Sequence, residues 1–219
     1  MPRRRTPDAF LQACATGDLA TMRQFIARGT DVNMPEWKDM KPLALALDNN
    51  QLAAMNLLLQ NKADPNALYI SEPMLHHAFF KANRKAVDIL LEAGAAPTAL
   101  EKGIYSIVDF ATRGGDEVLV QKAIRLLFSA GFDMQNVYDE ALNAAVVAGD
   151  VYLAEFFIQR GAHPDSAGHN FCFGYPPLVK AALSNDEKMV VMLARYGATA
   201  GIHLPEVQAL LKQRGDADE

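Results

Sequence analysis

The stretch Gln60-Asn61-Lys62-Ala63-Asp64-Pro65-Asn66 decides the fold, because a similar ending follows an apolar segment six times along the chain. Its third position, most often a glycine, recurs at residues 29, 62, 94, 131, 161 and 197. Intervals of 30 to 37 residues are typical of proteins built from stacked supersecondary units. The sequence therefore predicts a repeat array. The six endings are residues 27–33, 60–66, 92–98, 129–135, 159–165 and 195–200.

Each unit of the array reads as two helices joined by a polar turn. Apolar residues in 54–59, 87–91 and 123–127 recur three and four positions apart, which places them on one face of a helix. The glycine that follows suits a left-handed helix end, and Lys62 takes that position once at a local cost. About ten residues before each such helix lies a shorter one with small residues on its packed face. The separating turns are residues 16–18, 49–51, 115–116, 148–150 and 184–186.

The motifs of these units resemble the ankyrin repeat over about residues 8–200. The opening motif is matched by Lys41-Pro42-Leu43-Ala44 and Pro176-Pro177-Leu178-Val179, and the closing motif by Asp31-Val32-Asn33 and Asp64-Pro65-Asn66. His76, in Met74-Leu75-His76-His77-Ala78, stands where the family has a structural histidine. The resemblance implies an all-α ankyrin-repeat solenoid of about six helix-turn-helix repeats with a C-terminal capping helix. Most units lack the family's Thr and His, so we expect an array less stable than a consensus one.

The predicted organisation has four parts. The array begins after a flexible basic start, and extra residues between Gly115 and Gly131 should lengthen a helix or its turn in the fourth unit. A last helix with Pro205 near its first position should cover the sixth unit. The parts are residues 1–7 (basic start), 8–200 (array, with units about 8–35, 36–67, 68–100, 101–135, 136–168 and 169–200), 201–214 (capping helix) and 215–219 (acidic tail).

Composition disfavours several classes of protein. The net charge of −5 argues against a nucleic-acid backbone as partner, which requires clustered Lys and Arg. No apolar run reaches the roughly 18 residues of a membrane span, and the basic start leads into no apolar core of a secretory signal. Two cysteines far apart make no disulfide framework. We expect a cytoplasmic protein, with export without a cleavable signal as the alternative.

No catalytic, cofactor or metal site emerges from the motifs. His76 and His77 are adjacent, so on a helix they point about 100° apart, and His163, His169 and Cys172 lack a fourth metal ligand. Cys14 stands at a small packed position of the family, so we expect a buried, inert thiol. Cys172 is expected to be more exposed, but no motif places a base beside it. The sequence predicts no enzyme, no cofactor and no metal.

The loop tips before the first helices are the candidate binding surface. Every tip carries an aromatic residue, and Trp and Tyr are the types most enriched at binding hot spots. The alternatives are that the aromatic side chains pack against neighbouring loops and that the polar residues are simply solvated. The tips are residues 35–40, 68–72, 101–105, 136–139 and 166–175. The candidate protein-binding residues are Trp37, Lys38, Met40, Tyr69, Ile70, Tyr105, Tyr138, Phe173 and Tyr175 in the tips, with Asp48, Lys81 and Arg113 at the ends of the first helices.

The resemblance implies a non-catalytic module that binds a partner protein through the loop tips and the concave face of the first helices. We expect a monomer without nucleic-acid or membrane partners, and the acidic balance weakly favours a basic partner protein. The alternatives are a scaffolding homo-oligomer, and a bacterial effector or toxin-neutralising protein that acts by binding.

Overall fold

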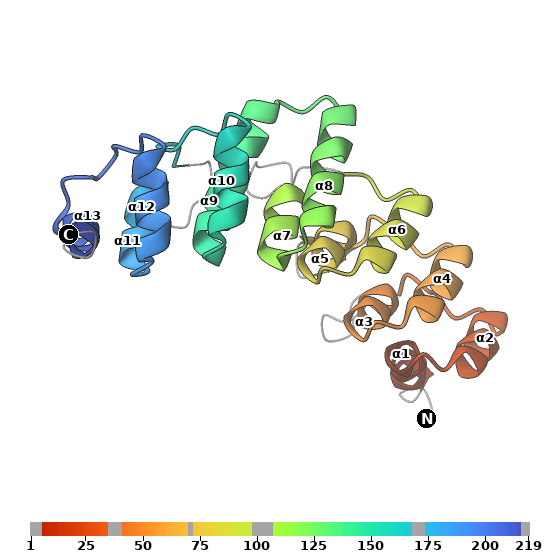
Figure 1. Ribbon diagram of the computed structural model, residues 1–219. Coiled ribbons are helices and arrows are strands. Elements are labelled where there is room, and N and C mark those ends of the chain that lie inside the picture. The colour runs from red at the N-terminus through yellow and green to blue at the C-terminus, as the bar shows by residue number, and fades with distance from the viewer. Residues whose placement is uncertain (1–5, 35–40, 70–71, 98–106, 168–173, 216–219) are drawn as a thin grey trace. The chain divides into compact units, whose positions relative to one another are not determined.

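The computed structural model describes residues 6–34, 41–69, 72–97, 107–167 and 174–215. These residues form thirteen α-helices and one two-stranded hairpin (Figure 1). The chain divides into two compact units, an N-terminal unit of residues 1–96 and a C-terminal unit of residues 97–219.

The N-terminal unit consists of three helix pairs. The first helices α1 and α3 pack on each other, and the second helices α2, α4 and α6 pack in a row. A short antiparallel hairpin of β1 and β2, with Leu68 opposite Pro73, leads into α5. The elements are α1 (Thr6–Thr16), α2 (Leu19–Ala27), α3 (Pro42–Asp48), α4 (Leu52–Gln60), β1 (Leu68–Tyr69), β2 (Glu72–Pro73), α5 (Met74–Phe80) and α6 (Arg84–Glu92).

The C-terminal unit has three further pairs and a closing helix. Its first helices pack in the order α7, α9, α11, its second helix α10 packs on α12, and α13 packs on α11 and α12. The predicted all-α repeat solenoid with a C-terminal capping helix is confirmed. The elements are α7 (Ile107–Gly114), α8 (Glu117–Ser129), α9 (Met134–Ala148), α10 (Val151–Gln159), α11 (Pro177–Leu183), α12 (Glu187–Arg195) and α13 (Pro205–Gly215).

Polar caps and left-handed residues set the ends of the helices. Five of the six second helices begin after an Asp or Asn whose side chain accepts a hydrogen bond from a backbone N–H of the first turn. The predicted glycine position is left-handed in every repeat, and Lys62 adopts a φ of 69° there. A second left-handed residue stands between the two helices of each pair. It is Gly17, Asn50, Ala82, Gly115, Gly149 or Asn185.

The two longest helices lie in the C-terminal unit. Helix α8 has 13 residues where the other second helices have 9, so the extra residues of the fourth unit lengthen a helix, as predicted. Helix α9 has 15 residues and includes residues 136–139. The prediction of a loop tip at 136–139 is therefore wrong. Asp133 caps the N-terminus of α9 by accepting from Gln135 N, and Val137 and Ala141 bury one helix face, so nothing interrupts the helix before residue 149.

The closing residue of one repeat binds the loop of the next. Asn66 Oδ1 accepts a 2.8 Å hydrogen bond from Ala96 N, and Gln135 Nε2 donates a 2.8 Å bond to Gly161 O. Asp165 Oδ1 accepts from the backbone of residues 199 and 200 at 2.8 and 2.9 Å. Each of these three side chains lies four residues after a left-handed residue, so the same position supplies the link in these three repeats.

The core of each unit lies between its helix layers. Phe10, Met22, Met55, Leu58 and Leu90 are among the fully buried side chains of the N-terminal unit. In the C-terminal unit, the fully buried side chains include Ile107, Leu119, Leu127, Phe157 and Leu193. None of the described helices is both long enough and apolar enough to cross a membrane.

Candidate functional site

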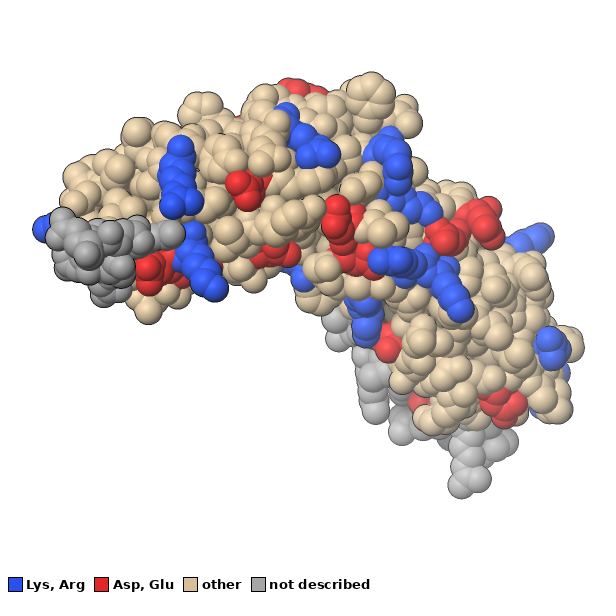
Figure 2. Space-filling view, in the orientation of Figure 1, with Lys and Arg blue, Asp and Glu red and all other residues tan. Residues whose placement is uncertain are grey.

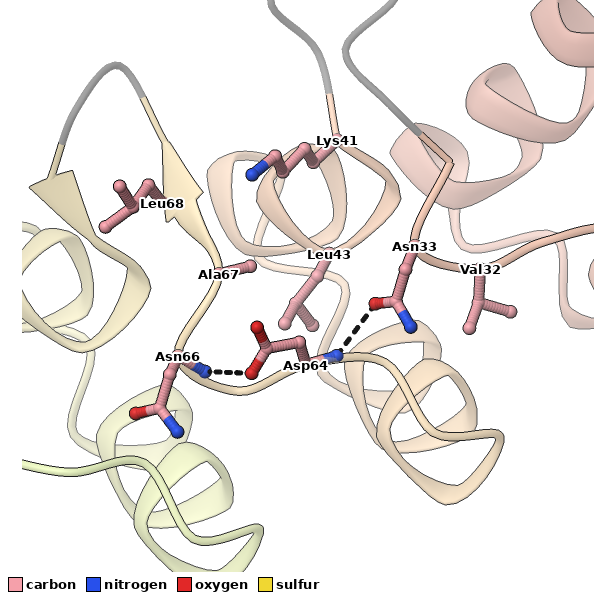
Figure 3. Close-up of a pocket in the computed structure, with 8 residues that line it drawn as sticks. All are labelled: Val32, Asn33, Lys41, Leu43, Asp64, Asn66, Ala67 and Leu68. Atoms are coloured by element: carbon pink, nitrogen blue, oxygen red, sulfur yellow. Dashed lines mark hydrogen bonds between the residues drawn. The ribbon is translucent and has the colours of Figure 1, made fainter.

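A hollow of about 310 Å³ opens between the closing loops of the first two repeats (Figure 3). The start of α3 completes its wall. Asn33 Oδ1 accepts a 2.8 Å hydrogen bond from Asp64 N, and Asp64 Oδ1 accepts a 2.9 Å bond from Asn66 N. These bonds fix the polar wall of the hollow before any partner arrives. The lining residues are Val32, Asn33, Lys41, Leu43, Asp64, Asn66, Ala67 and Leu68.

Leu68 gives the hollow an apolar side that faces water. Its side chain comes from β1 and is 46% exposed, whereas Leu43 on α3 is buried. The hollow therefore combines one exposed apolar side chain with polar groups whose positions are set by hydrogen bonds. The predicted tips at 35–40 and 68–72 adjoin this hollow in sequence.

A second feature of the N-terminal unit joins the ends of α3 and α5. His77 Nε2 lies 2.7 Å from Asp48 Oδ1, and Lys81 Nζ lies 3.0 Å from the same oxygen. Next to this cluster, Asn83 Nδ2 donates a 2.9 Å hydrogen bond to Asn50 Oδ1. The two repeats are therefore tied together by polar side chains at the helix ends.

A shallow depression of about 470 Å³ lies beside the Asp48 cluster. Its charged rim has one acidic residue, Asp48, against Lys81, Arg84 and Lys85. The rim is therefore positively charged, although the chain as a whole is acidic. On the face shown in Figure 2, by contrast, acidic and basic side chains are interspersed over both units.

The C-terminal unit buries polar side chains on its first helices. Asn143 on α9 is 5% exposed. Its amide donates to Ser166 O at 2.8 Å, and its carbonyl oxygen accepts from Lys180 Nζ on α11 at 2.6 Å. On α7, Asp109 is 1% exposed and lies 3.2 Å from Arg113. Lys180 and Arg113 thus compensate the burial of Asn143 and Asp109.

Glu140 on α9 lies close to this polar group. Burial raises its pKa to about 7, and the negative charges of Asp109 and Asp139 add to the shift. The carboxyl is therefore partly protonated near neutral pH, which lowers the electrostatic cost of placing it near two other acids.

The described residues bring no cluster of histidines and cysteines together that could hold a metal ion. No group of three or more His, Cys, Asp or Glu side chains in that part of the chain has the geometry of a metal site. His76 is fully buried, as its place in the repeat implies. Cys14 is also fully buried, as expected, and this burial raises the pKa of its thiol to about 12. Cys172 lies outside the described residues.

Comparison with known proteins identifies ankyrin repeats in this chain. A family model described as "Ankyrin repeats (3 copies)" matches residues 10–101. The human ASB11 ankyrin repeat domain superposes with a TM-score of 0.69 at 22% identity, covering 93% of this chain and 96% of that one. Residues 10–101 are ankyrin repeats, and the whole chain has the ankyrin-repeat fold.

Two further ankyrin-repeat structures have the same fold. An ankyrin repeat domain from Acinetobacter baumannii AYE has a TM-score of 0.61 at 19% identity, covering 87% of this chain and 98% of that one. The ankyrin repeat domain of Bcl-3, a member of the IkappaB protein family, has a TM-score of 0.62 at 20% identity, covering 93% and 97%. No curated protein sequence matches this chain. Ankyrin repeat domains are generally protein–protein interaction modules.

The structure describes some of the candidate binding residues and leaves others undescribed. It brings Asp48 and Lys81 together in one cluster of the N-terminal unit. In the C-terminal unit, Arg113 pairs with Asp109, Tyr138 is half-buried within α9, and Tyr175 is 46% exposed before α11. Tyr69 belongs to β1, but its side chain is not described. The candidates outside the described residues are Trp37, Lys38, Met40, Ile70, Tyr105 and Phe173.

Sequence reasoning missed the wall of the hollow and the buried polar residues. The closing motifs contain Asn33 and Asp64, but were interpreted only as a family signature. His76, Asp109 and Asn143 all lie six residues before a left-handed turn residue. That shared position in the repeat was the signal that could have identified Asp109 and Asn143.

Proposed function

We propose that this chain binds another protein without catalysing a reaction, through the hollow of Figure 3, the loop tips next to it and the nearby ends of the first helices. The observation that carries the proposal is Leu68, a leucine 46% exposed at the edge of a hollow whose polar wall is already hydrogen-bonded. The family's general role in protein–protein interaction supports the same reading.

The partner would bury an apolar side chain against Leu68. Burying such a side chain contributes about 1.5–3 kcal/mol, so a few contacts of this kind are needed for a stable complex. The aromatic residues Trp37 and Tyr69 of the neighbouring tips would supply further contacts. The basic rim of Lys81, Arg84 and Lys85 would face acidic side chains of the partner.

The experiment compares baits that differ at the hollow. Biotinylated wild type, Leu68→Glu and Phe128→Glu are each incubated with lysate of the source organism, and the recovered proteins are quantified. Phe128 is the matched control, because it is 71% exposed on α8 of the C-terminal unit. The partner is a protein recovered with wild type and Phe128→Glu, and lost with Leu68→Glu. It must then bind purified wild type directly in a titration.

Two results would reject the proposal. The first is equal recovery of every protein by all three baits while Leu68→Glu keeps its wild-type unfolding midpoint. The second is a wild-type protein that self-associates in light scattering, together with a Leu68→Glu variant that is monomeric. The hollow would then be a contact between copies of this chain.

A further inference from the structure

Four exposed apolar side chains of the C-terminal unit occupy two repeated positions. Val147 and Leu183 lie two residues before a left-handed turn residue and are 62% and 60% exposed. Val118 and Tyr152 lie three residues after such a residue and are 51% and 62% exposed. We call these four residues the turn edge. Since the repeats stack in register, equivalent positions line one edge of the unit.

Neighbouring turns of this edge approach closely. A side chain placed on Gly149 would come within 3.7 Å of Asp186 Oδ2, which belongs to the turn of the next repeat. The first helices α9 and α11 pack together, as do α10 and α12. In Figure 1 the turns after α9 and α11 lie together along the lower edge of this unit. The turns beside Val147, Tyr152 and Leu183 are therefore neighbours at one edge of this unit.

The same positions differ in the N-terminal unit. There the residues before the turns are Ala15, Asp48 and Phe80, and those after the turns are Ala20, Ala53 and Lys85. Five of these six are small or charged, as solvent exposure favours. The fold therefore does not require large apolar side chains at the turn edge of the C-terminal unit, and exposed apolar side chains gathered at one edge are typical of an interaction site.

Acidic residues surround the turn edge. Asp116, Asp150 and Asp186 cap α8, α10 and α12, and Glu117 and Glu187 follow two of these caps. Arg113 and Lys188 occupy the other two of these repeated positions in the C-terminal unit. The whole C-terminal unit has 10 basic and 16 acidic residues, whereas the N-terminal unit has 11 and 10. A protein segment that binds an apolar edge flanked by acidic residues is expected to carry apolar and cationic side chains, because these complement the edge and its flanks.

We propose that the turn edge is a second interaction surface, which binds a cationic amphipathic segment of a partner protein. The segment lays leucine or aromatic side chains on Val147, Tyr152 and Leu183, and its Lys or Arg side chains face the acidic caps. This surface lies on different residues from the hollow of the N-terminal unit, so either can fail without the other.

The test uses a synthetic probe and the full-length protein. The probe is a fluorescein-labelled, 18-residue amphipathic helix of Leu and Lys, and its binding is measured by fluorescence anisotropy. Matched probes have the Lys replaced by Glu, or the same composition in scrambled order. The variants are Val147→Ser/Tyr152→Ser/Leu183→Ser and, as control, Phe128→Ser. Circular dichroism establishes that each variant is folded.

We expect the Leu/Lys helix to bind wild type and Phe128→Ser with equal affinity, and the triple variant at least tenfold more weakly. Glu117→Gln/Glu187→Gln should weaken binding several-fold and reduce its dependence on salt. Equal affinity for wild type and the folded triple variant would overturn the proposal, as would tight binding of the Leu/Glu or scrambled probe. A wild-type dimer that the triple variant abolishes would overturn it too, because the edge would then be occupied by a second copy of this chain.

Discussion

Asn33 and Asp64 link two repeats although they are 31 residues apart in sequence: Asn33 Oδ1 accepts a 2.8 Å hydrogen bond from the backbone N–H of Asp64. The Asn33 amide donates a second bond, of 2.7 Å, to Lys62 O. One side chain thus binds the backbone on both sides of residue 63. Because repeat arrays are stabilised by contacts between neighbours, such links contribute directly to the stability of the array.

Asn33→Ala should lower the free energy of unfolding by about 1–2 kcal/mol, because two hydrogen bonds between repeats are lost and each contributes about 0.5–1.5 kcal/mol. Urea unfolding followed by circular dichroism measures the change. Asn61→Ala is the matched control, since the Asn61 amide bonds only to Leu57 O of its own helix. A loss no larger for Asn33→Ala than for Asn61→Ala would contradict the role of Asn33 as a link.

Lys62→Gly should raise the free energy of unfolding by about 0.5–1 kcal/mol, because Lys62 has a φ of 69° where the other repeats have glycine. The Lys62 carbonyl that accepts from Asn33 is retained. Thermal unfolding gives the comparison. The reverse change, Gly94→Lys, should destabilise by about 1 kcal/mol through backbone strain, because nothing lies within 4 Å of a Cβ atom at that position.

The fold could be predicted because its signals are local and periodic. Six endings with one left-handed position each identify the repeat, and the left-handed φ of Lys62 shows that the position is set by the backbone rather than by the residue. The start of α9 could not be predicted in this way. The spacing of the other units indicated a loop tip around Tyr138, but Asp133 starts the helix earlier and no Gly or Pro interrupts it.

The candidate site was predicted only in part, since it depends on which repeats become neighbours. The sequence places Asp48 and Lys81 at helix ends, but only the structure shows that Lys81 and His77 contact the same carboxylate oxygen of Asp48. The hollow beside Leu68 arises from two closing loops and a helix start, and no single motif encodes such a combination.

Cys14 should resist thiol reagents in the folded protein. In a Cys172→Ser variant, labelling by iodoacetamide should be at least about a hundredfold slower in buffer than in urea above the unfolding transition, because the thiol is fully buried. Burial raises its pKa to about 12, so labelling of the native state should stay slow at pH 9. Rapid labelling at a urea concentration far below the transition would show that α1 opens independently of the rest of the unit.

Glu140→Gln should stabilise the protein at pH 8 and leave its stability unchanged at pH 4. Burial, reinforced by the charges of Asp109 and Asp139, raises the pKa of Glu140 from 4.5 to about 7. Between these values the folded state binds more protons than the unfolded state, so stability falls as pH rises from 4.5 to 7 and then stays low. Allowing for partial solvent screening, the variant should gain about 1–2 kcal/mol at pH 8.

Urea unfolding at both pH values measures this gain, and ¹³C NMR of the Glu carboxyl groups should show one resonance titrating near pH 7 that the variant lacks. If no carboxyl titrates above pH 6, or if the variant gains equally at pH 4 and pH 8, the proton on Glu140 does not link the stability of the C-terminal unit to pH.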